Sequence, residues 1–186
     1  MSEPDAAAPS RPLIIVAAVL GVGLVAGVVA IGLIGGNDDT DTTPSDANQP
    51  SGPLPLVAVA APKSGSAACD TLTDALPDTM ESAGERLARR KLAKPAPEGA
   101  AAWGGVNPVV LRCGIHKPDA LTKTSKLRQI NGVQWLPVTD QGASTWYAVD
   151  RKVYIALTVP RDAGTGPLQE ISDVIDKELE AVPPRP

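Results

Sequence analysis

The longest apolar run of the sequence lies near its start. Residues 13–34 are 22 consecutive positions without a charged or polar side chain. A helix of that length spans about 33 Å, which is enough to cross the roughly 30 Å apolar core of a bilayer. We therefore predict a transmembrane helix over residues 13–34. A cleaved signal peptide is the alternative, but its apolar stretch is about 7–15 residues long and ends at a small-residue cleavage site. This run instead leads into Gly35, Gly36 and acidic residues.

Charge on the two flanks of this run sets the expected orientation. Arg11 is the only basic residue before it, and no Lys or Arg follows it until Lys63. Because basic residues favour the cytoplasmic side, we expect residues 1–12 to be a cytoplasmic tail. The chain is then an integral, single-pass protein of the cell membrane. No Cys directly follows the run to carry a lipid anchor.

Glycine spacing within the run bears on oligomeric state. Gly23 with Gly27, and Gly32 with Gly36, have the GxxxG spacing that lets two membrane helices approach closely. Glycine is also common in membrane helices, so the oligomeric state stays open.

The next segment, residues 35–53, is polar and acidic. Its four aspartates face no basic residue; they are Asp38, Asp39, Asp41 and Asp46. With almost no apolar side chains, burial cannot offset the entropy cost of ordering it. We expect a disordered linker here, followed by one folded extracytoplasmic domain over residues 54–186.

Short apolar runs in the domain predict strands. They lie at residues 54–60, 109–115, 133–138, 145–149 and 152–159. The last run alternates, with Val153, Ile155, Leu157 and Val159 on one face, which is typical of a half-buried antiparallel strand. Asp150 and Arg151 separate the last two runs, so we expect these to form a hairpin.

Apolar positions at helical spacing predict helices. Residues 66–76 place Cys69, Leu72 and Leu76 on one face, and residues 81–92 predict a second, polar helix. Gly166-Pro167 opens a final helix that Pro183 ends. The apolar face of that helix consists of Leu168, Ile171, Ile175 and Leu179.

This order of elements predicts an α+β fold. After the transmembrane helix comes one small domain, an antiparallel sheet with helices packed on one face. About 130 residues suffice for a single core. The chain has no Phe, three Trp and two Tyr, so the core must be built from Val, Leu, Ile and Ala.

Cys69 and Cys113 are the only cysteines. An even number of cysteines in an exported domain favours a disulfide. It would tie the helix at residues 66–76 to the strand at residues 109–115. Two buried free thiols are the alternative.

A longer pattern is built around the second cysteine. Residues 101–118 are AAWGGVNPVVLRCGIHKP, and the motifs NGVQWLPV and STWYAVDRKVYIALTVP follow. Together they resemble a family of actinobacterial envelope proteins of unknown function, over residues 54–182. The positions that carry the resemblance are Trp103, Arg112, Cys113, Gly114, Trp135, Trp146, Asp150 and Tyr154. The resemblance implies the envelope of a high-GC Gram-positive organism and transfers no catalytic residue. Many members are exported or lipid-anchored, whereas this chain has the apolar run of residues 13–34.

Charge is segregated along the domain. The net charge is −4 over residues 54–85, +8 over residues 86–128 and −3 from residue 129 onward. We predict that part of the basic block contacts anionic lipid or acidic wall polymer. The candidates are Arg89, Arg90, Lys91, Lys123 and Lys126. Ordinary solvated faces are the alternative.

Arg112 is a separate candidate because it interrupts an apolar strand. It either points to solvent, pairs with a carboxylate such as Asp150, or lies beside Trp103, Trp135 or Trp146 as an anion or cation–π site.

Catalytic signals are weak. His116 is the only histidine and is expected in a surface loop, and no nucleophile, nucleotide or metal motif is present. Asp70, Asp74 and Asp78 recur every four residues, as on a solvated helix face. We expect no catalytic residue, metal site or cofactor, and no nucleic-acid partner for a domain outside the membrane.

The function predicted from these features is a non-catalytic, membrane-anchored binding or interaction module of the cell envelope. Its partner would be anionic lipid, wall polymer or an envelope protein. An extracytoplasmic enzyme and a scaffold subunit of an envelope complex are the alternatives.

Overall fold

The computed structural model describes residues 52–140 and 142–186. The predicted cytoplasmic tail, transmembrane helix and nearly all of the acidic linker lie outside these residues, so those predictions stay as they are. Within the described ranges, no helix is long and apolar enough to cross a membrane.

The centre of the domain is a six-stranded antiparallel sheet with the order β3-β4-β8-β7-β6-β5. The strands are β3 (Ala100–Trp103), β4 (Val109–Ile115), β5 (Arg128–Ile130), β6 (Val133–Asp140), β7 (Ala143–Ala148) and β8 (Tyr154–Pro160). Four of the five predicted strands are confirmed as β4, β6, β7 and β8. The predicted hairpin is β7 and β8, which pair antiparallel.

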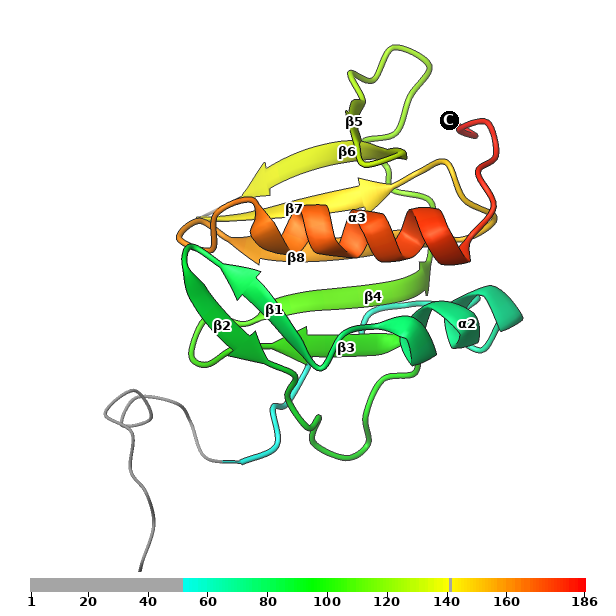
Figure 1. Ribbon diagram of the computed structural model, residues 1–186. Helices are drawn as coiled ribbons and strands as arrows, with labels where there is room; N and C mark the ends of the chain where they lie inside the picture. Colours follow the sequence, from blue (N-terminus) through cyan, green and yellow to red (C-terminus); the bar gives the residue numbers. More distant parts are fainter. Residues whose placement is uncertain (1–51, 141) are drawn as a thin grey trace, which may run out of the picture. The chain divides into compact units, whose positions relative to one another are not determined.

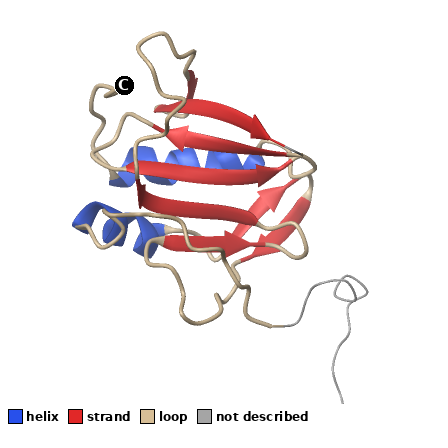
Figure 2. Cartoon of the chain, turned by 180° about the vertical axis from the view of Figure 1, so that it is seen from behind, coloured by secondary structure: helices blue, strands red, loops and turns tan. Residues whose placement is uncertain are grey.

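Two helices and a small hairpin cover one face of this sheet. They are α2 (Ala67–Ala75), α3 (Gly166–Glu178) and the two-stranded sheet of β1 (Thr79–Ser82) and β2 (Glu85–Ala88). In Figure 1 they lie in front of the strands, and in Figure 2, seen from behind, the sheet is in front of the helices. The α+β class and the one-sided helix packing are therefore confirmed.

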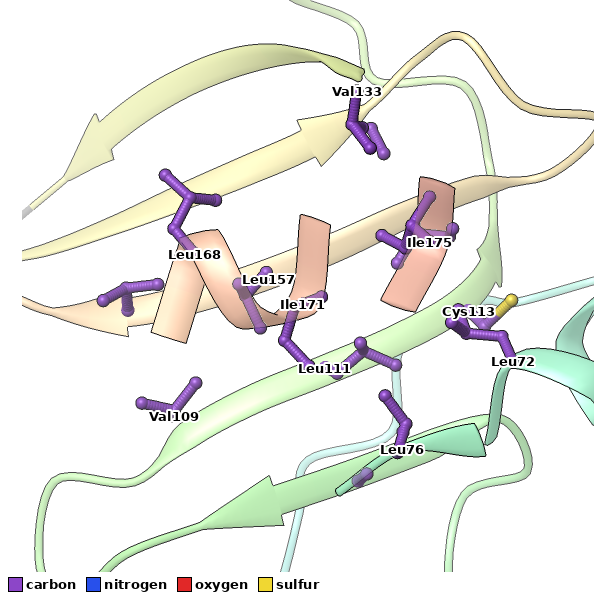
Figure 3. Packing of buried hydrophobic residues seen from close by; sticks show 14 of the residues in the cluster. Leu72, Leu76, Val109, Leu111, Cys113, Val133, Leu157, Leu168, Ile171 and Ile175 are labelled. Atoms are coloured by element: carbon purple, nitrogen blue, oxygen red, sulfur yellow. The ribbon is translucent and has the colours of Figure 1, made fainter. Parts of the chain in front are cut away.

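The core lies between the sheet and these helices (Figure 3). The predicted apolar face of the last helix is buried at every position: Leu168, Ile171, Ile175 and Leu179. Val109, Leu111 and Cys113 of β4 meet this face from the sheet. The helix ends at Glu178, ahead of Pro183, because Leu179 already has an extended backbone.

A disulfide joins Cys69 of α2 to Cys113 of β4, with a Cα–Cα distance of 5.6 Å. Both residues are fully buried. The predicted link between this helix and this strand is confirmed.

The predicted helix at residues 81–92 is wrong. The segment instead holds the end of β1 and all of β2, which pair through a two-residue turn at Ala83 and Gly84. Both turn residues have positive φ, 50° and 85°, the conformation that tight hairpin turns require. Met80, on β1 just before the predicted helix, is buried in the core, so core packing favours the hairpin over a helix here.

The predicted strand at residues 54–60 is also wrong. Leu54 makes a single parallel bridge to Leu92, and the following residues join no sheet. The segment leaves this bridge and ends where the Lys63 N–H donates to the Gly114 carbonyl, at 3.0 Å. In Figure 1 it passes behind β3, on the face that the helices leave free.

Candidate functional site: a groove with Arg112 on its floor

A groove of about 560 Å³ lies on the sheet face opposite the helices, at the β3 edge. Its floor contains Ala100 and Arg112, which are directly paired across β3 and β4. One wall is the segment at residues 55–61, and the other is the loop at residues 93–98. Pockets for small ligands are typically about 300–1,000 Å³, so this groove has a suitable size.

The alternation of β4 places Arg112 here. Val109, Leu111 and Cys113 point into the core, so Arg112 must point to the opposite face. The cross-strand neighbours of Arg112 are Ala100 and Ala156. Both have short side chains, so neither offers the guanidinium a polar partner.

The Arg112 guanidinium is half-buried, and no hydrogen bond or ion pair joins its side chain to any other residue in the ranges 52–140 and 142–186. Burial lowers the pKa of Arg112 from its ordinary value. The alternative that pairs Arg112 with Asp150 is wrong, because the Asp150 carboxylate binds Arg151 at 2.9 Å. Trp103 and Trp135 belong to the core on the other face.

The walls of the groove are mainly apolar. They carry Pro, Ala, Leu and Val side chains, with Lys94 and Glu98 as charged residues. The backbone N–H and C=O groups of residues 56–60 bond to no other described residue. Val57 and Val59 in the same segment are 81% and 51% exposed.

Arg89 and Arg90, which we predicted as binding residues, make contacts within the fold. Arg89 donates to the carbonyls of Thr73 and Leu76 at the end of α2, and its guanidinium lies 6.0 Å from the Trp103 ring centre. Arg90 donates to the Gly104 carbonyl at 2.9 Å and to the Gly52 carbonyl at 2.8 Å. These bonds anchor the start of the described chain beside the β3 edge.

The remaining predicted cations, Lys91, Lys123 and Lys126, are exposed. Lys91 lies with Arg89 and Arg90 beside β3, whereas Lys123 and Lys126 lie in the loop that leads into β5. β3 and β5 are the two opposite edges of the sheet. The fold therefore does not gather the basic block into one patch, and lipid or polymer binding by its parts stays a prediction.

The structure also pairs charges that the sequence analysis did not connect. Arg151 is fully buried and binds both Asp150, at 2.9 Å, and Asp176 on α3, at 3.0 Å. Burial raises the pKa of Asp150, and its bonds to the Gln134 N–H and to Arg151 offset part of that shift. This cluster holds the β7–β8 turn against α3.

Other titratable candidates are dispersed. His116 is exposed after β4, as predicted, and Asp70, Asp74 and Asp78 are exposed on and after α2. Within the described residues, no three His, Cys, Asp or Glu side chains are arranged to hold a metal ion.

The loop at residues 93–98 is the part of the site that the sequence analysis missed. Its only signal was a proline-rich composition, KPAPEG at residues 94–99, which predicts a loop without assigning it a role.

Comparison with known proteins gives one match. The profile of a family of proteins of unknown function matches residues 18–184. No curated protein and no solved structure matches the chain.

Proposed function

Because the chain belongs to DUF3515, a family of proteins of unknown function, we propose a role from the groove itself. The domain is a non-catalytic binding module, held outside the membrane by residues 13–34. Its ligand is a cell-envelope component with an anionic group, which Arg112 receives. We extend the same proposal to the envelope of an actinobacterium, where the sequence resemblance points.

One observation carries this proposal. Arg112 is partly withdrawn from water yet has no partner among the described residues. Removing a guanidinium from water costs free energy unless an anion or an acceptor compensates. A residue that contributes only to folding would be expected to have such a partner, as Arg151 does. An open groove above Arg112 gives an external anion access to it.

Two features support an extracytoplasmic setting. The Cys69–Cys113 disulfide is typical of oxidising compartments outside the cytoplasm. The uncharged run at residues 13–34 has the length of a membrane span. Anchoring near the membrane would keep the groove within reach of envelope components.

Site-specific photocrosslinking in native membranes tests this function. A photoreactive residue placed at Ala96, an exposed position of the groove wall, should give an adduct. Arg112→Gln should abolish the adduct, and Arg112→Lys should retain part of it, because the charge is kept but the planar fork is lost.

A photoreactive residue at Lys177, which is 82% exposed on α3, is the control on the helix face and should give no such adduct. The function would be contradicted if the photoreactive residue at position 96 gave equal adduct yields in the wild-type background and in the Arg112→Gln background.

A further inference from the structure

We infer that the ligand of this groove is an extended peptide that pairs edge-on with residues 56–60 and presents a carboxylate to Arg112. The inference rests on the proposed function and deepens it, because it names the chemical class of the ligand. It follows from two sets of polar groups that have no partner within the described chain, the backbone of residues 56–60 in one wall and the Arg112 guanidinium on the floor.

The first set is the backbone of the groove wall. Residues 56–60 contribute N–H and C=O groups that have no hydrogen-bond partner in the described chain. The wall residues Leu56, Ala58 and Val59 belong to this stretch. An extended peptide offers alternating donors and acceptors that can satisfy such a row, as in recognition by strand addition.

The side chains of this wall agree with strand pairing. The sequence of residues 56–60 is LVAVA, an apolar run with two strand-favouring valines, which is why the pattern alone predicts a strand here. Within residues 52–140 and 142–186 no strand pairs with this segment, and Val57 and Val59 are 81% and 51% exposed. Of the two, Val59 lines the groove, so a peptide strand bound there would cover it.

The second set is the charge on the floor. Arg112 and Lys94 contribute two positive charges to the groove lining and Glu98 one negative charge, so the lining carries +2 − 1 = +1. This balance suits one carboxylate better than a polyanion. The planar guanidinium also matches a carboxylate through two parallel hydrogen bonds.

Binding of short fluorescent peptides to the full chain in detergent micelles tests the inference. The reference probe alternates Val and Thr and ends in a free carboxylate. The second probe has a C-terminal amide, the third has the amide and an internal Glu, and the fourth has the free carboxylate with alternate backbone nitrogens methylated. Inorganic phosphate is the competing anion.

We expect the amide probe to bind about 10–100-fold more weakly than the reference, which is the worth of one charge-assisted hydrogen-bond pair. Methylation should weaken binding about tenfold or more through lost strand pairing. Arg112→Gln should make the reference and amide probes equal. If the probe with the internal Glu recovers binding, the carboxylate that Arg112 receives belongs to a side chain. If it does not, that carboxylate is the chain terminus.

Hydrogen exchange on the unmodified protein gives a second measurement that needs no variant. The amides of residues 56–60 should exchange fast in the free protein and become protected when the reference peptide binds. Amides of α3 should not change. Peptide binding without this protection, or binding unaffected by methylation, would overturn the strand pairing.

Failure of the inference differs from failure of the function. Arg112-dependent adducts at Ala96 without binding of any peptide would refute the peptide ligand and leave an anion-binding module. The peptide ligand alone would also be refuted if phosphate displaced the reference probe while the probes with and without a carboxylate bound equally well. Absence of any adduct from Ala96 in the chain that retains Arg112 would refute both.

Discussion

Arg112 and Arg151 lie in two regions of this domain that treat the same side chain in opposite ways. Arg151 is fully buried between the β7–β8 turn and α3, where Asp150 and Asp176 neutralise it. Arg112 is half-buried on the opposite side of the sheet from α3, with no partner in the described chain. The first arrangement stabilises the fold, and the second leaves the fold with a cost that an external anion can offset.

The surroundings of the two residues follow the same division. Around Arg151 the chain is tightly constrained: a Cβ at Gly132 would collide with the Asp176 carboxylate, and the Gly132 φ is +78°. Around Arg112 the walls contain apolar side chains and unpaired backbone groups. What separates the two arginines is the counter-charge, because Arg151 binds two carboxylates and Arg112 binds none in the described chain.

The largest expected effect lies at the paired arginine. Arg151→Met should lower the free energy of unfolding by about 3–5 kcal/mol, because it leaves Asp150 buried without its counter-charge. Urea denaturation followed by tryptophan fluorescence measures this. Arg161→Met, at an exposed arginine, is the control and should change stability by about 0.5 kcal/mol or less. Similar losses in both variants would break the comparison.

Loss of the disulfide should have the second-largest effect on stability. Replacing Cys69 and Cys113 by Ala should cost about 2–4 kcal/mol, because the unfolded chain regains the freedom that the cross-link removes. The same denaturation assay measures the loss. A loss under about 1 kcal/mol would contradict a stabilising role for this cross-link, which lies on the helix-covered face of β4.

A smaller effect should appear with pH. Burial raises the pKa of Asp150 above its ordinary value of 3.8. The protonated carboxyl therefore contributes stability that is present below the ordinary pKa and is lost as pH rises through the raised one. Wild-type protein should gain stability relative to Asp150→Asn as pH falls from about 7 to about 4. If the difference in unfolding free energy between wild type and Asp150→Asn stayed constant across that pH range, burial of the Asp150 carboxylate would carry no free-energy cost.

Pattern alone was enough for much of the fold. The β8 alternation and the spacing of Leu168, Ile171 and Ile175 each follow from burial on one face, and both elements formed as expected. The disulfide followed from the cysteine count. These features depend on residues close in sequence or on a single possible pairing.

The errors had long-range causes. Residues 79–88 form a hairpin in place of the helix predicted over residues 81–92, because Met80 packs in the core and Ala83 and Gly84 adopt positive φ. Residues 54–60 have a strand sequence without a neighbouring strand in the described chain. Arg112 was identified as a candidate, but its groove required knowing that residues 55–61 and 93–98 form two walls around Ala100 and Arg112.

The unfolding free energy of Arg112→Met tests the central claim most directly, and its expected change is the smallest of all. Methionine has similar length without the charge, so it removes the cost of partly burying an unpaired guanidinium. The Arg112→Met variant should have a free energy of unfolding within about 0.5 kcal/mol of wild type, or above it. A loss of about 2 kcal/mol or more, approaching that of Arg151→Met, would contradict it. Arg112 would then serve the fold rather than a ligand.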